Sequence, residues 1–211
     1  MAKLVGGPLG SYRGKAGGTI GSSWKGIAVV KSMPLSVANP QTVAQTAQRV
    51  KFAACIAAAR LLLSNLITTY WNPFAKKMSG INSFVKQNID CFATGSFSVP
   101  GSFYAARGIL MGVENLEIEA GAGIHKIFAT WDDNSGIGDA LATDVSCLCV
   151  YNENMETWHF FSDGSNREAT SSDFTLDGFE IGNELYCYFF FTRPDNSRVS
   201  DSVYKHVIAG P

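Results

Sequence analysis

Residue types that most catalytic and metal sites require are scarce in this sequence. Only three of the 211 residues are histidines, at positions 125, 159 and 206, and none has a second histidine or an acid at the spacing of a zinc-binding helix. All three fall in stretches expected to be strands. No G-x-S-x-G nucleophile elbow occurs either. The sequence therefore predicts a protein that is not an enzyme, with no catalytic, cofactor-binding or metal-binding residue.

Two local motifs come near a ligand site but lack its spacing. The run 10–15 has three residues between its glycines where a P-loop has four, and Ala16 stands where that loop needs Ser or Thr to hold magnesium. Asp132, Asp133, Asn134 and Asp139 could hold calcium, but the spacing of an EF-hand is absent. We interpret these acids as turn residues.

The cysteines do not form a disulfide framework. Their number is odd, they are widely scattered and no CxxC pair occurs, since they stand at positions 55, 91, 147, 149 and 187. We expect reduced, mostly buried residues that pack as small apolar groups. This expectation fits synthesis in the cytoplasm.

Signals for export and for membrane insertion are also weak. Residues 1–30 lack the basic, apolar and small-residue order of a signal peptide. The most hydrophobic window, 52–70, has the length of a membrane span, but Arg60 lies at its centre with Ser64 and Asn65 nearby. We therefore expect no membrane span.

Acidic residues are almost missing from the first half of the chain. Residues 1–110 hold twelve lysines and arginines against one acid, Asp90, which gives a net charge of +11. Residues 111–211 hold five basic and seventeen acidic residues, a net charge of −12. The basic half could meet DNA or an acidic protein surface, and it could equally meet the acidic half of a neighbouring copy. Ordinary solvated surface charge is the simpler alternative.

Three regions follow from composition. Residues 1–38 are glycine-rich and predict an extended arm or loose hairpin, with β-like stretches at 19–24 and 27–32. This region is too small to fold alone, so an ordered arm must pack on the rest of the chain or on another subunit. The second and third regions are a basic helical hairpin at 39–104 and an acidic all-β domain at 105–211.

The helical region begins at a clear signal. Asn39 is a fitting N-cap and Pro40 fits the first helical position, and apolar residues then recur at steps of three and four. One helix over 40–71 would span roughly 48 Å. Pro73 ends it, and a second helix would carry Phe74, Met78, Ile81, Val85 and Ile89 on one side.

The C-terminal region alternates with period two. Seven strands separated by turn-rich stretches are expected at 109–119, 124–131, 143–151, 156–161, 173–176, 184–192 and 199–207. Seven short strands in this length, with a tryptophan on an early one, are typical of an immunoglobulin-like or fibronectin-like sandwich. The whole chain is thus predicted to be α+β.

The strand at 184–192 is apolar on both faces. A central strand covered on both sides is the simplest interpretation. The alternative is an exposed aromatic face that binds glycan or a surface protein, which would require Trp158 and Tyr188 to be exposed.

Two segments of the sequence are distinctive. One runs from Gly14 to Ile27 as Gly-Lys-Ala-Gly-Gly-Thr-Ile-Gly-Ser-Ser-Trp-Lys-Gly-Ile, and the other from Asn39 to Phe52 as Asn-Pro-Gln-Thr-x-x-Gln-x-x-Gln-Arg-x-Lys-Phe. Together with the stretches 131–134, 143–144, 150–152 and 199–202, they resemble a DUF6266-like family of uncharacterised proteins from Bacteroidota and their phages, crAss-like phages among them. The family carries no established activity, so the resemblance implies context and not chemistry.

That context is a structural protein of a virion. The resemblance implies a bacteriophage component such as a tail ring or connector subunit, made in the host cytoplasm and located in the virion with other virion proteins. A ring needs a head-to-tail interface, which the charge split could supply. The expected interface residues are Arg13, Lys15, Trp24, Lys25 and Arg49. The alternatives are a glycan- or surface-protein-binding module and a nucleic-acid-associated protein that uses the basic half.

Overall fold

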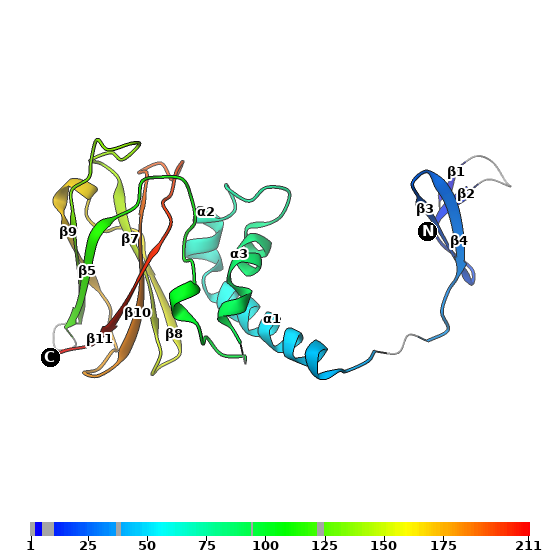
Figure 1. Cartoon of the computed structure of the whole chain (residues 1–211), viewed down its shortest axis with the longest axis horizontal. Helices are drawn as coiled ribbons and strands as arrows, with labels where there is room; N and C mark the ends of the chain where they lie inside the picture. The colour runs from blue at the N-terminus through cyan, green and yellow to red at the C-terminus, as the bar shows by residue number, and fades with distance from the viewer. Residues whose placement is uncertain (1–2, 6–10, 37–38, 94, 122–124) are drawn as a thin grey trace. The chain divides into compact units, whose positions relative to one another are not determined.

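The computed structural model describes residues 3–5, 11–36, 39–93, 95–121 and 125–211. These form two compact units, Met1–Thr42 and Val43–Pro211, which we call the N-terminal unit and the body (Figure 1). The helices and the C-terminal strands share the body. The predicted boundaries after residues 38 and 104 therefore divide the sequence by composition, and they stay predictions. Gly10 of the P-loop-like run and Ile124 of an expected strand lie outside the described residues.

The N-terminal unit is an antiparallel sheet in which neighbours in sequence are neighbours in space. Its strands, in the order β1-β2-β3-β4, are β1 (Lys3–Val5), β2 (Ser11–Ala16), β3 (Thr19–Trp24) and β4 (Ile27–Ser32). The expected stretches 19–24 and 27–32 are confirmed as β3 and β4. A two-residue turn joins them, and its residues Lys25 and Gly26 have φ of 48° and 84°, the conformation of a tight hairpin turn.

The body contains two antiparallel sheets and a group of short helices. One sheet has the order β11-β10-β7-β8 and the other β5-β6-β9. The strands are β5 (Glu114–Gly121), β6 (Lys126–Asp132), β7 (Val145–Asn152), β8 (Thr157–Phe161), β9 (Ser171–Thr175), β10 (Glu184–Thr192) and β11 (Val203–Ile208). The helices are α1 (Val43–Leu61), η1 (Leu63–Ile67), α2 (Thr68–Tyr70), α3 (Gly80–Asn88), η2 (Ile89–Cys91), η3 (Pro100–Ser102) and η5 (Arg167–Ala169).

Two hydrophobic cores lie on opposite faces of the four-stranded sheet. The first joins it to the three-stranded sheet through residues such as Ile127, Trp131 and Phe174. The second joins it to the helices through residues such as Leu66 and Phe84. The body therefore has three layers, with the four-stranded sheet in the middle (Figure 1).

Strand β10 contributes to both cores by alternation. Leu185, Cys187, Phe189 and Phe191 belong to the core between the sheets, whereas Tyr186, Tyr188 and Phe190 belong to the core under the helices. The expectation of a central strand covered on both sides is confirmed.

All seven expected strands are present, with ends shifted by a few residues. The range 184–192 matches β10 without change. The largest shift is at 109–119, where the strand begins only at Glu114 and a bulge separates Glu114 from Glu117. The expectation that His125 lies in a strand is wrong, because it occupies a turn before β6 with φ of 51°. Mixed helix and sheet, the coarse fold class, is confirmed.

The prediction of one continuous helix over 40–71 is wrong. Helix α1 begins at Val43 and ends at Leu61, and a π-helical turn follows. The segments Val43–Leu61 and Leu63–Tyr70 meet at 72°. The bend lets Leu66, Ile67 and Tyr70 enter the core under the helices, which a straight helix could not do.

The second helix is shorter than expected. Helix α3 begins at Gly80, because Ser79 caps it by accepting a hydrogen bond from the Asn82 amide at 3.3 Å. Phe74 and Met78 therefore precede the helix. Among the described residues no single helix is long and apolar enough to cross a membrane, and the bent pair α1 and Leu63–Tyr70 meets the length and composition test only jointly.

Buried charges hold the loops at one end of the sheets. Arg167 and Asp144 are both fully buried, with Nε of the guanidinium 3.2 Å from a carboxylate oxygen. Arg167 also donates to the Met111 and Gly112 carbonyls at 2.8 and 3.1 Å. Its guanidinium carbon lies 3.9 Å from the centre of the Phe191 ring. Every buried nitrogen and oxygen atom of the two side chains thus has a hydrogen-bond partner within the protein, which makes this cluster a structural one.

Candidate functional site

The expected interface residues lie in both units. Arg13 and Lys15 are on β2, Trp24 ends β3 and Lys25 is in the turn that follows, and all four are exposed. The Lys25 ammonium lies 5.1 Å from the centre of the Trp24 ring, within cation–π range. Arg49 is exposed on α1 of the body. Four of the five residues thus share the small sheet.

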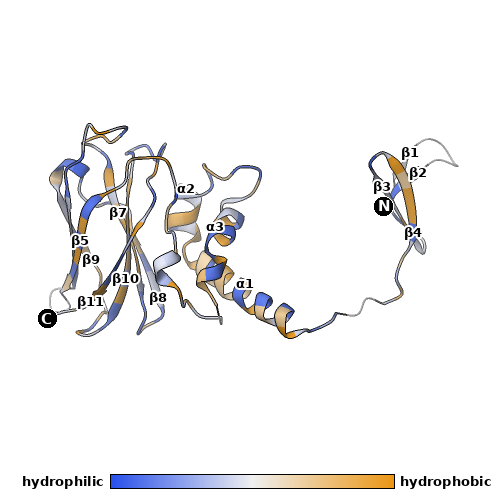
Figure 2. Cartoon of the chain, in the orientation of Figure 1, coloured by the Kyte–Doolittle hydropathy of each residue, from blue (hydrophilic) through white to orange (hydrophobic). Residues whose placement is uncertain are grey.

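Strand β4 is exposed along its whole length, and its first four residues, Ile27 to Val30, are apolar. All six of its residues are exposed, with Ile27 at 61% and Val30 at 56% of full exposure, and Trp24, which pairs with Ile27, is 64% exposed. The hydropathy colouring marks the apolar part of β4 (Figure 2). β4 is the last strand in the sheet order, so among the described residues its outer edge pairs with no further strand. An apolar edge strand of this kind is a template for pairing with another chain.

The first half of α1 is exposed on every side. Residues 43–50 are all exposed, whereas burial starts only at Cys55, Ala58 and Ala59. The helix accordingly extends away from the rest of the body (Figure 1). Val43 and Phe52 are 88% and 50% exposed. A helix this far from its core lacks the tertiary packing that normally stabilises helices of its length.

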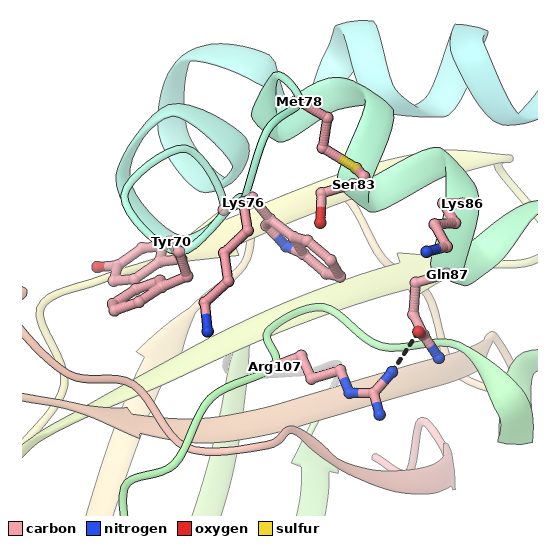
Figure 3. A pocket seen from close by; sticks show the side chains of 9 residues that line it. Tyr70, Lys76, Met78, Ser83, Lys86, Gln87 and Arg107 are labelled. Carbon is pink, nitrogen blue, oxygen red and sulfur yellow. Dashed lines mark hydrogen bonds between the residues drawn. The ribbon is translucent and has the colours of Figure 1, made fainter. Parts of the chain in front are cut away.

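A basic pocket opens in the body between the helices and the 104–107 segment (Figure 3). Its volume is about 360 Å³. Cationic side chains reach it from three places: Lys76 precedes α3, Lys86 lies on α3 and Arg107 comes from the loop after η3. The other lining residues are Tyr70, Trp71, Phe74, Met78, Ser83 and Gln87. We call this hollow the basic pocket.

The floor of the basic pocket is fixed by packing and hydrogen bonds. The Trp71 indole donates to the Ala105 carbonyl at 2.7 Å, and its ring meets Phe84 edge-on at 5.4 Å. The Arg107 guanidinium donates to the Gln87 side-chain oxygen and lies 5.6 Å from the centre of the Tyr104 ring. The pocket is therefore a preformed feature of the body and not a gap between loose side chains.

The cations of the basic pocket have no carboxylate partner among the described residues. Lys76, Lys86 and Arg107 form no ion pair there. The one acid of the basic half, Asp90, lies 3.8 Å from Lys51 instead. A preformed pocket with three uncompensated positive charges favours an anionic partner.

The pocket residues do not form a nucleophile–base pair. Its hydroxyl groups belong to Ser83 and Tyr70, and the Tyr70 hydroxyl faces Cys147, 3.7 Å away. Burial raises the pKa of Tyr70 well above its ordinary value, which keeps it protonated. No group of three or more potential metal ligands occurs among the described side chains.

The polar residues expected to form turns around 132–139 make both local and long-range hydrogen bonds. Asp133 accepts a hydrogen bond from the Ser135 amide at 2.9 Å, and Asp139 accepts one from the Met111 amide at 2.9 Å. These bonds lower the pKa of both carboxyl groups. Asn134 turns inward and donates to the Gly112 carbonyl at 3.0 Å. The bond of Asp133 agrees with the interpretation as turn chemistry, whereas Asp132 lies in β6 and the bonds of Asn134 and Asp139 to the 111–112 segment are long-range.

All five cysteines are buried free thiols, as expected. Burial raises the pKa of Cys91 to about 11 and that of Cys55 to about 12. Thiols with such pKa values are almost fully protonated at neutral pH and are poor nucleophiles.

The aromatic residues Tyr188 and Trp158 of the four-stranded sheet face the helices. Tyr188 is fully buried, and its hydroxyl donates to the Pro100 carbonyl at 2.9 Å. Trp158 is half-buried, with its ring 5.1 Å from Phe97 and 5.0 Å from Phe103. The exposed aromatic face that a glycan-binding module would need on β10 is covered.

Sequence reasoning did not find the basic pocket. Lys76, Lys86 and Arg107 are spread over 32 positions, and only the fold brings them together. The signal that could have indicated such a site was the near absence of acids from residues 1–110.

Comparison with known proteins gives a family and no activity. No curated protein matches the chain. A family model described as a family of unknown function matches residues 11–206, which covers β2 through most of β11. The chain belongs to this family, DUF6266.

Proposed function

We propose that this protein is a non-enzymatic structural subunit that assembles with copies of itself. The observation that carries the proposal is the exposed apolar run Ile27 to Val30 of β4, in a sheet that has almost no core of its own. A soluble surface normally scatters its apolar side chains singly, and a continuous apolar strand edge marks an interaction site.

The N-terminal unit is too small to be stable by itself. Of its described residues with known exposure only Gly21 is buried. Isolated small sheets without a hydrophobic face against a partner are marginal in water. Its order is accounted for if a neighbouring subunit covers β4, with Trp24, Lys25, Arg13 and Lys15 in or beside the contact and Arg49 in a second contact along α1.

The same features suit a component of a bacteriophage virion, such as a tail ring or connector subunit. Ring subunits combine a compact body with arms and helices that reach a neighbour, and this chain has a compact body, a separate small sheet and a projecting α1. The placement in a virion is an inference from this architecture together with the family resemblance.

The order of strands supports a finer description of the body. The first, second and fifth strands form one sheet, and the seventh, sixth, third and fourth form the other. This arrangement supports an immunoglobulin-like or fibronectin-like sandwich, in which two antiparallel sheets enclose one core. The contact of α1 with α3 supports the helical hairpin.

The nucleic-acid alternative has weaker support. Its positive feature is the basic pocket with three unpaired cations. Single-stranded nucleic acid is held by aromatic rings that stack on bases, and the rings of Tyr70 and Trp71 are buried in the pocket floor.

Sedimentation velocity of the full chain over a wide concentration range tests the proposal. We expect concentration-dependent oligomers, and a strictly monomeric protein would refute self-assembly. Quantitative mass spectrometry of gradient-purified phage particles tests the location. A copy number equal to that of the portal, or a simple multiple, is expected, and absence from particles would refute the virion assignment.

A further inference from the structure

We propose that the basic pocket of one copy receives Phe128 and the acidic outer face of the three-stranded sheet of the next copy, in a head-to-tail contact. This inference rests on the proposed self-assembly and names the two surfaces that meet. It is independent of the contact formed by β4.

The outer face of the three-stranded sheet is acidic. Its exposed residues include Glu117 and Glu119 on β5, Asp132 on β6 and Asp173 on β9. Lys126 is the one basic residue of these strands, and it pairs with Asp173. Glu117 and Glu119 form no ion pair among the described residues. This face thus carries uncompensated negative charge, as the pocket carries uncompensated positive charge.

An aromatic side chain stands in the middle of that face. Phe128 is 38% exposed on the central strand β6. Its directly opposite neighbours are Glu119 on β5 and Asp173 on β9. Opposite side chains in antiparallel strands lie close together, so a carboxylate flanks the ring on each side. Such a residue costs free energy while it faces water and gains it when a partner covers it.

The pocket has the complementary composition. Trp71, Phe74 and Met78 give it apolar walls, and the three cations stand around them (Figure 3). Phe74 and Met78 are 36% and 41% exposed, so these walls are available to a partner. The acidic face presents an aromatic ring between two carboxylates, and the pocket presents apolar walls edged by lysine and arginine. The two surfaces are therefore complementary in hydrophobicity and in charge. Aromatic anchors that fill pockets with charges at the rim are typical of protein interfaces.

The two surfaces belong to different layers of the body. The pocket is formed by the helical layer and the 104–107 segment, whereas the acidic face is the outer side of the three-stranded sheet. One copy can therefore use both surfaces at once. A contact between two different surfaces is heterologous, and repeated copies of it give a ring if the rotation closes and a filament if it does not.

A charge exchange tests the contact in the full-length protein. Lys86→Glu places an acid in the pocket, and Glu119→Lys places a base on the sheet face. Each variant alone should associate at least about tenfold more weakly, because like charges then meet. In an equal mixture, the altered pocket of the Lys86→Glu variant can bind the altered face of the Glu119→Lys variant. The native pocket of the Glu119→Lys variant can likewise bind the native face of the Lys86→Glu variant. The association constant should therefore return to within about threefold of wild type.

Matched controls separate this contact from general charge effects. Lys205→Glu and Asp177→Lys reverse exposed charges outside the two surfaces and should leave association unchanged. Phe128→Thr removes the ring from an exposed strand position and should weaken association about tenfold or more without lowering the melting temperature. All variants change exposed side chains, so unaltered melting temperatures verify their folding.

The outcomes distinguish the two proposals. If the wild-type chain associates but the mixture is no tighter than the single variants, the head-to-tail contact is wrong and self-assembly stands. If the wild-type chain is monomeric throughout, both are wrong. If inorganic phosphate raises the melting temperature of wild type but not of Lys86→Glu, and the mixture shows no recovery, the pocket is a site for a free anion and not for a second copy.

Discussion

In the body, strands β7 and β10 are covered on both faces, whereas in the N-terminal unit strand β4 is exposed along its whole length. Both regions are antiparallel sheets whose neighbouring strands are joined by hydrogen-bonded ladders. Each backbone hydrogen bond contributes a net stabilisation of about 1 kcal/mol. Ordering each residue costs about 1–2 kcal/mol of conformational entropy, which is at least as large. Ladders alone therefore cannot hold a sheet together. The body has two cores that supply the remaining stabilisation, whereas the described part of the N-terminal unit has almost none.

Separating the two regions should have the largest effect. A peptide of residues 1–42 should be unfolded in isolation, because its strands bury almost no apolar surface. A chain of residues 43–211 should fold and melt cooperatively. Circular dichroism and proton NMR dispersion measure both. A cooperative thermal transition in the isolated 1–42 peptide would show that the small sheet does not depend on a partner.

Removing the buried carboxylate of Asp144 should destabilise the body. Asp144→Ala leaves the Arg167 guanidinium buried without its counter-charge, which should lower the free energy of unfolding by about 3–5 kcal/mol. Urea denaturation measures this change. Arg198→Ala is the control, because its pair with Asp139 is partly exposed and should contribute under about 1 kcal/mol. Equal effects of the two variants would contradict a structural role for the buried cluster.

A glycine pair probes the N-terminal unit without touching the body. A Cβ at Gly21 would lie 2.1 Å from the backbone oxygen of Tyr12, so Gly21→Ala must push β2 away from β3. A Cβ at Gly18 meets nothing within 4 Å, which makes Gly18→Ala the matched control. We expect Gly21→Ala to weaken self-association about tenfold or more and to leave the melting temperature of the body unchanged. Equal association of both variants would exclude the small sheet from the interface.

Thiol labelling should give the smallest effect in the native state. All five cysteines are buried in the body, and burial raises the pKa of Cys147 and of Cys187 to about 12. An aromatic disulfide reagent at pH 8 should therefore modify none of them until urea unfolds the body. Absorbance of the released thiolate follows the reaction. Rapid labelling of one native thiol would show that a part of the body opens locally.

Much of the body could be predicted because its pattern is local. Short strand-like stretches bounded by turn residues predict all seven strands, and the double apolar face of 184–192 predicts the central strand. The helices were predicted less well. The window 40–71 has helical periodicity throughout, and the 72° bend at its end arises from packing of Leu66 and Tyr70 onto the sheet, which the periodicity does not encode. His125 was misplaced because the turn before β6 interrupts an apolar run.

The surfaces that we propose for assembly were only partly predictable. The exposed residues Trp24 and Lys25 could be named because they stand in a glycine-rich segment that cannot build a core. The basic pocket could not be located, since Lys86 and Arg107 meet only through the loop that follows η3. The position of Phe128 between two acids could not be predicted either, because it depends on the register of β5, β6 and β9.

Strand β10 contributes side chains to both cores, and this affects how the body unfolds. If the helices leave, Tyr186, Tyr188 and Phe190 face water, and if the three-stranded sheet leaves, Leu185, Phe189 and Phe191 do so. Neither outer layer can therefore detach without exposing one face of β10 to water. The body should behave as one cooperative unit, with its slowest amide hydrogen exchange along β10 and β7.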